Sequence, residues 1–123
     1  MNVKPVKARA GHATARGGRA VLHLDGQPVG DVVVKGWDGS WGYGNFVPGE
    51  RFSDYAVLFG TWSLLMHADS ADEKLSDAAA QELMQTETRL DAIKSKLFFP
   101  KNQQWVDVAE LNIDGELLEW KEY

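Results

Sequence analysis

The sequence predicts an α+β protein: an antiparallel sheet of about five strands with one face covered by a two-helix hairpin. Strand-like runs stand near the start of the chain and at its end, and two long helical patterns lie between them. The expected order is therefore strands, helix, helix, β-hairpin. The 123 residues suit one domain, so we expect a single α+β domain over 1–123.

The start of the chain is basic. Residues 1–19 carry five lysines or arginines and no acid. From Val6 to Arg16, small apolar residues alternate with basic or polar ones, which is typical of a protected edge strand. We therefore expect a basic N-terminal edge strand or arm over 1–19, with a disordered tail as the alternative.

A β-hairpin is predicted next. Residues 20–24 are apolar, and Val29 to Lys35 contains three consecutive valines. Between them, the segment 25–28 reads Asp-Gly-Gln-Pro, in which aspartate binds nearby backbone, glycine permits a positive φ and proline fixes the exit. The valine run indicates a central strand with partial cover on both faces.

The richest aromatic segment follows. Gly36 to Gly49 holds five glycines in fourteen residues, together with Trp37, Trp41, Tyr43 and Phe46. A strand places Trp41 and Tyr43 on one face and leaves the opposite face to glycines. We expect these rings to pack on the helix that follows, with a binding patch as the alternative.

Two helices are expected in the middle of the chain. The first runs over 53–68 and is apolar nearly all round, which predicts a central, buried helix. The second begins after a cap at Ser70 or Ser76 and runs to about Phe98. Its narrow seam should pack on the first helix and the sheet, with dimerisation as the alternative. The seam comprises Leu75, Ala79, Leu83, Thr86, Leu90, Ile93 and Leu97.

The chain ends in a predicted β-hairpin, because Asp114-Gly115 lies between alternating runs. A two-residue turn at this dipeptide places Glu110 opposite Glu119, a carboxylate pair that we interpret as solvated. The apolar residues of the hairpin should face the core, namely Leu111, Ile113, Leu118 and Trp120.

Charge and composition exclude several classes of function. The net charge is −5, so the chain beyond residue 19 carries −10, and an acidic body repels nucleic acid. No apolar run is long enough to span a membrane. Cysteine is absent, which excludes disulfides and thiolate metal sites and fits a cytoplasmic location.

No catalytic, phosphate-binding or metal-binding motif stands out. The three histidines lack histidine or cysteine neighbours at ligand spacing, so we expect no metal and no cofactor. Catalysis is not expected either. The candidate residues for binding a ligand or partner are Trp37, Asp38, Trp41, Tyr43, Trp62 and His67.

The leading hypothesis is a non-enzymatic protein-interaction module or small subunit with an unknown protein partner. A homodimer is an alternative form of that partnership. The second hypothesis is a small-molecule binding protein with an aromatic-lined pocket between sheet and helices. A third, RNA binding by the basic arm, requires strongly salt-dependent affinity.

Overall fold

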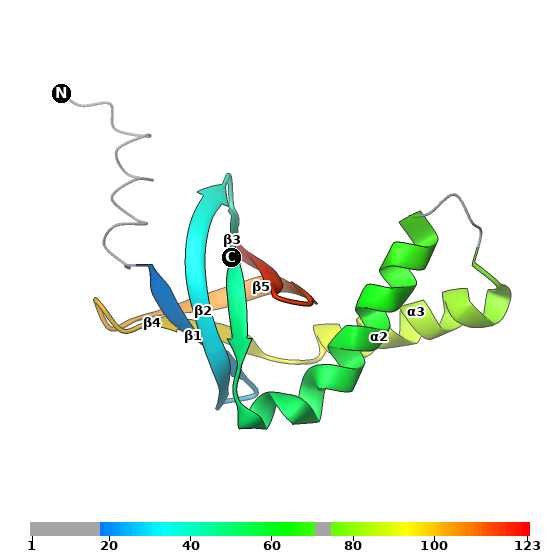
Figure 1. Ribbon diagram of the computed structural model, residues 1–123, viewed down its shortest axis with the longest axis horizontal. Helices are drawn as coiled ribbons and strands as arrows, with labels where there is room; N and C mark the ends of the chain where they lie inside the picture. The colour runs from blue at the N-terminus through cyan, green and yellow to red at the C-terminus, as the bar shows by residue number, and fades with distance from the viewer. Residues whose placement is uncertain (1–17, 71–74) are drawn as a thin grey trace.

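The protein folds as a six-stranded closed antiparallel β-barrel with two helices inserted between β3 and β4 (Figure 1). The computed structural model describes residues 18–70 and 75–123. The barrel order is β1-β2-β3-β6-β5-β4. Its elements are β1 (Arg19–Leu24), β2 (Gln27–Asp38), β3 (Trp41–Pro48), the short 3₁₀ helix η1 (Glu50–Phe52), α2 (Ser53–Ser70), α3 (Asp77–Asp91), β4 (Ser95–Phe99), β5 (Gln104–Asp114) and β6 (Leu117–Glu122).

Glycine turns shape the hairpins, as the sequence predicts. Asp25 and Gly26 both have positive φ values, 51° and 82°, and join β1 to β2. Gly39 joins β2 to β3 with a φ of 66°. Gly115 has a φ of 62° in the turn between β5 and β6. The hairpins at 25–26 and at the end of the chain are therefore confirmed.

The register of the last hairpin differs from the expected one. Asp114 pairs with Leu117, so the turn residues are Gly115 and Glu116 rather than Asp114 and Gly115. Glu110 consequently lies opposite Lys121, and the expected pairing of Glu110 with Glu119 is wrong. The hairpin residues that we expected to face the core do face it, because this shift of register preserves the alternation along each strand. They are Leu111, Ile113, Leu118 and Trp120.

The sheet is closed, not open with about five strands. β1 pairs with β2 on one side and with β4 on the other, where Leu22 lies opposite Leu97. We expected residues 95–98 to end the second helix, but they belong to β4 because Leu97 and Phe99 alternate into the barrel interior, where both are fully buried. Pairing with two neighbouring strands outweighs the local helical pattern.

The barrel interior explains the glycines of β3. Trp120 is fully buried, and a Cβ added at Gly42 would lie 2.2 Å from its ring. A Cβ at Gly44 would lie 2.3 Å from the carbonyl oxygen of Val33. The bare face therefore accepts a ring from β6, and Trp41 and Tyr43 lie on the outer face instead of packing on the helix as we expected.

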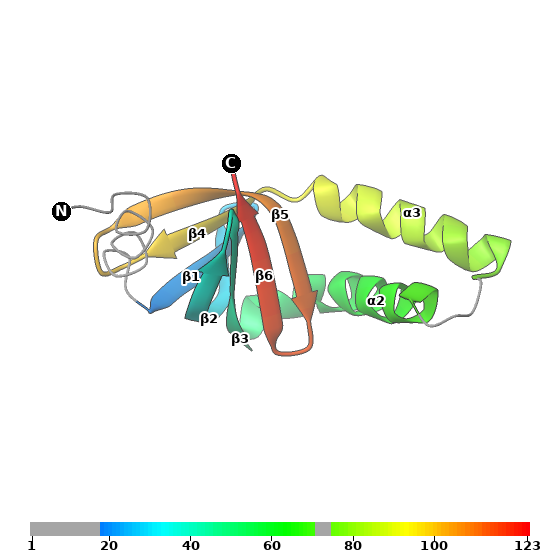
Figure 2. The ribbon, with the colours of Figure 1, turned by 90° about the horizontal axis from the view of Figure 1, so that it is seen from above.

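The helices extend to one side of the barrel rather than covering a sheet face (Figure 2). α2 packs mainly on α3, β5 and η1, and Phe59 is its one buried residue with a described side chain. The expectation of a central, buried helix is therefore wrong. The barrel fills its own interior with side chains, which leaves no room for a helix.

α3 begins where one of the two expected caps stands. The Ser76 hydroxyl accepts a hydrogen bond from the backbone N–H of Ala79 at 3.1 Å. The alternative cap with Glu73 lies outside the described residues, as does the strand or tail expected over 6–16. Leu90 and Ile93 of the seam pack against the core, so this part of the seam packs within the chain.

The fit between Gly42 and Trp120 gives a test of the interior packing. We expect Gly42→Ala to lower the free energy of unfolding by about 1–3 kcal/mol, because neither the strand nor the buried ring has space for a methyl group. Gly60→Ala is the matched control, since its Cβ meets nothing within 4 Å in the middle of α2. The free energy of unfolding of Gly60→Ala should rise by roughly 0.5–1 kcal/mol, because alanine favours the helix over glycine. Urea unfolding measures both changes, and equal stability of the two variants would contradict the packing.

Candidate functional site

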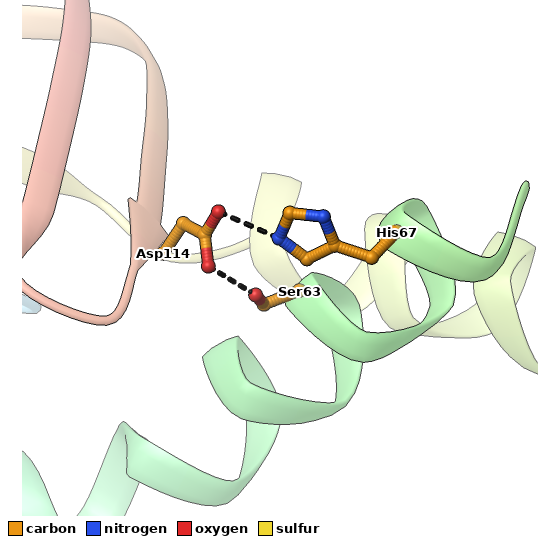
Figure 3. Close-up of polar contacts among 3 residues, drawn as sticks. All are labelled: Ser63, His67 and Asp114. Carbon is orange, nitrogen blue, oxygen red and sulfur yellow. Dashed lines mark hydrogen bonds and ion pairs between the residues drawn. The ribbon is translucent and has the colours of Figure 1, made fainter. Parts of the chain in front are cut away.

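A polar clasp joins the barrel to α2 (Figure 3). Asp114, at the end of β5, accepts a hydrogen bond from the Ser63 hydroxyl at 2.6 Å through Oδ1. Its Oδ2 lies 2.8 Å from Nε2 of His67. Ser63 and His67 are four residues apart and so share one face of the helix. The clasp therefore fixes the tip of the β5–β6 hairpin against α2.

The clasp contains serine, histidine and aspartate, but its geometry is not that of a catalytic triad. A triad needs the serine hydroxyl bonded to the imidazole, which takes its proton. Here the Ser63 hydroxyl and the His67 ring both bind the carboxylate. The side chains of His67 and Asp114 are also 68% and 41% exposed. The arrangement supports a structural contact and provides no base for Ser63.

Hydrogen bonding changes the acidity of Asp114. The bond from Ser63, followed by the bond from His67, lowers the pKa of this carboxyl below its ordinary value. Partial burial opposes the shift, and the charge of His67 adds a smaller lowering effect. The clasp is consequently strongest when Asp114 is ionised.

A second polar contact holds the beginning of α2. The Tyr55 hydroxyl donates to Asp25 Oδ2 at 3.1 Å, and the Lys94 backbone N–H donates to Asp25 Oδ1 at 3.0 Å. Burial, and then the hydrogen bond to Asp25, raises the pKa of Tyr55. The turn between β1 and β2 thus anchors both the entry to the helices and the return to β4.

The structure gathers four of the six candidate residues in one hollow on the barrel. It has a volume of about 740 Å³ and is lined by Trp37, Asp38, Trp41, Gly42, Tyr43, Asn112 and Glu119. These residues come from β2, β3, β5 and β6. We refer to this feature as the aromatic hollow. Sequence reasoning missed Asn112 and Glu119, because their place here depends on the observed register of β5 and β6.

Trp37 differs from the other rings of the hollow. It packs edge-to-face on Trp120, with the ring centroids 5.7 Å apart. The indole N–H groups of Trp37 and Trp120 both donate to Glu122 Oε2, at 3.2 Å and 3.1 Å. Trp37 is therefore tied to the core, whereas Tyr43 is 39% exposed on the outer face.

The other two candidate residues lie elsewhere. Trp62 lines a separate cavity of about 360 Å³ between the helices and β5. Its wall combines apolar side chains, such as Phe59 and Leu90, with polar ones, such as Glu87 and Glu110. His67 belongs to the clasp. The six candidate residues are thus divided among three places. Sequence reasoning also missed Ser63 and Asp114 of the clasp. The spacing of Ser63 and His67 could have placed them on one face of a helix, but nothing in the sequence indicates that Asp114 lies beside them.

α2 carries an exposed apolar stripe, formed by Val57, Gly60, Leu64 and Ala68. Their spacing of three and four residues places them along one side of the helix. The side chains of Val57 and Leu64 are 79% and 75% exposed. Ser63 and His67, which hold Asp114, border this α2 stripe. Gly60 has open space beside it.

Comparison with known proteins assigns no relationship: no family model matches the chain, and no curated protein or solved structure is significantly similar to it. Over 18–70 and 75–123, no group of three or more histidine, aspartate or glutamate side chains is arranged to hold a metal ion. No helix in this part of the chain has the length and apolarity needed to cross a membrane.

The clasp predicts a pH-dependent stability. We expect Asp114→Asn to lower the free energy of unfolding by at most about 1 kcal/mol near pH 6, since the groups are largely exposed. The folded-state pKa of Asp114 is lowered, so its stabilisation is present above the unfolded value of about 3.9 and is lost as the pH falls through the folded value.

Urea unfolding from about pH 6 down to about pH 2 checks this expectation. The difference between wild type and Asp114→Asn should disappear at the acidic end. Asp31→Asn is the control, because Asp31 is exposed in β2 and its side chain has no hydrogen-bond or ion-pair partner among the described residues. A difference for Asp114→Asn that stays constant over the whole range would contradict the clasp.

Proposed function

We propose that the protein is a non-enzymatic protein-interaction module and that the α2 stripe is its docking surface. The observation that carries the proposal is the exposure of Val57 and Leu64 on a helix that extends from the barrel (Figures 1 and 2). Exposed apolar side chains that line up along one element are typical of surfaces that bind another protein.

The stripe has no role in the packing of the fold. Strand residues form most of the core, and α2 contributes Phe59 to it from the side of the helix opposite the stripe. A helix that is apolar all round is normally covered all round. Covering Val57 and Leu64 with a partner would remove apolar surface from water, which contributes about 25 cal/mol per Å².

The charge of the helices indicates the chemistry of the partner. α2 and α3 together carry six acidic residues and one arginine, Arg89. Two copies of this acidic surface repel each other, which disfavours a homodimer through the stripe. A partner segment with apolar side chains flanked by lysine or arginine suits this surface, as in an amphipathic helix laid along α2.

The absence of cysteine from the sequence supports the further proposal of a cytoplasmic location.

A pair of variants tests the docking surface. We expect Leu64→Asp to abolish capture of the partner from native lysate, because a carboxylate in the stripe opposes apolar contact and adds to the acidic charge. Met84→Asp is the matched control, since Met84 is an exposed apolar residue on α3, outside the stripe. Both substitutions replace an exposed side chain, and circular dichroism verifies that each variant is folded.

Quantitative mass spectrometry of the captured proteins gives the readout. A protein that is retained by wild type and Met84→Asp and depleted at least about tenfold by Leu64→Asp supports the proposal, as a loss of 1.4 kcal/mol corresponds to that factor. Identical captured sets for all three proteins would contradict it. Light scattering of the purified protein identifies a homodimer, which would replace the basic partner by a second copy of this chain.

A further inference from the structure

The packing of the barrel does not account for the two outer rings of the aromatic hollow, those of Trp41 and Tyr43. The interior is filled by other residues, and Trp41 and Tyr43 point away from it. Tyr43 is among the exposed large side chains, and its ring occupies the space above Gly36, where an added Cβ would lie 2.8 Å from the phenol oxygen. Gly36 therefore makes room for a ring that contributes little to the core.

Two carboxylates accompany these rings. Asp38 lies opposite Trp41 in the β2–β3 register, and Glu119 lies opposite Tyr43 in the β3–β6 register. Both residues line the hollow. Within the described parts of the chain, neither side chain makes a hydrogen bond or an ion pair, so both remain available to a ligand.

The basic residue closest in register is Lys121 of β6. It lies opposite Trp41 of β3 on one side and opposite Glu110 of β5 on the other. Lys121 does not line the hollow. The lining itself therefore contains acidic, amide and aromatic groups and no basic side chain. Such a lining repels phosphates and carboxylates and attracts positive charge.

We propose that the aromatic hollow binds an organic cation, specifically an alkylated ammonium group. The faces of tryptophan and tyrosine rings carry negative potential and attract such cations, and cages of aromatic residues recognise quaternary ammonium groups in this way. Asp38 and Glu119 supply the compensating charge, and Asn112 supplies a neutral polar contact. The cation reaches the hollow either on a free small molecule or on a methylated lysine side chain of a peptide.

This site is separate from the α2 stripe and does not rest on the proposed interaction function. The hollow is formed by barrel strands, whereas the stripe lies on the helix that extends from the barrel. Substitutions in one surface leave the residues of the other in place, so the two proposals fail or succeed independently.

Titration with choline, followed in ¹H–¹⁵N spectra, tests the proposal. Choline should produce saturable shifts at the Trp41 indole and at the Tyr43 and Glu119 amides. Its neutral isostere 3,3-dimethylbutanol has the same shape without the charge and should bind at least about tenfold more weakly. Equal affinity for the two compounds, or no saturable shift with choline, would overturn the proposal.

Variants assign the binding to the named residues. Trp41→Ala and Glu119→Gln should each weaken choline binding by roughly 3-fold to 30-fold. Trp105→Ala is the matched control, because Trp105 is also an exposed indole of the barrel but packs beside His23 and Phe98, away from the hollow. Dispersed spectra verify that each variant folds. A loss for Trp105→Ala as large as that for Trp41→Ala would overturn the assignment.

A second ligand distinguishes the two sources of the cation. The probe is an acetylated and amidated tripeptide with trimethyl-lysine between two glycines, compared with the same peptide carrying unmodified leucine. Tighter binding of the trimethyl-lysine peptide than of choline identifies a protein side chain as the natural source, and equal binding identifies the free cation. Binding of the leucine peptide with the same affinity would contradict recognition of positive charge.

Discussion

The burial of the Trp120 indole inside the barrel is the interaction on which the rest of the structure depends. The ring is fully buried against Gly42, and its N–H donates to Glu122, so the burial leaves no polar group unpaired. Gly44 lets β3 approach the backbone of Val33. Side chains of the strands fill most of the interior, and the strands close on each other through β1 and β4.

A filled, closed barrel determines which surfaces remain for function. Phe46 of β3 faces the interior, whereas Trp41 and Tyr43, on the other face of the same strand, lie outside. The barrel has no open face for a helix to cover, so α2 lies beside the barrel, held by Phe59 and by the bond between Ser63 and Asp114. The two resulting surfaces differ in shape, since one is a stripe on a helix and the other a hollow. Both have acidic surroundings, and we therefore propose positively charged binding partners for both.

Turns that depend on neighbouring residues could be predicted from the sequence, whereas pairing between strands far apart in the chain could not. Both hairpins form, because the turn at 25–26 and the turn next to Asp114-Gly115 depend on residues adjacent in the chain, although the last turn lies at 115–116, one residue later than expected. The helical seam continues past the true end of α3, because Leu97 fits both a helix of that period and a strand. Only pairing with β1 decides between them. Likewise, alternation places Trp41 and Tyr43 on one face, but whether that face is inside depends on Trp120, which is distant in the chain.

Nuclear Overhauser contacts between β1 and β4 test barrel closure most directly. A closed barrel predicts cross-peaks between the backbone protons of Val21 and Phe98 and of Leu22 and Leu97, which lie opposite each other in adjacent strands. It also predicts extended backbone couplings over 95–99. Sequential amide contacts typical of a helix through Phe98, with no cross-peaks to β1, would contradict closure and with it the outward placement of α2, Trp41 and Tyr43.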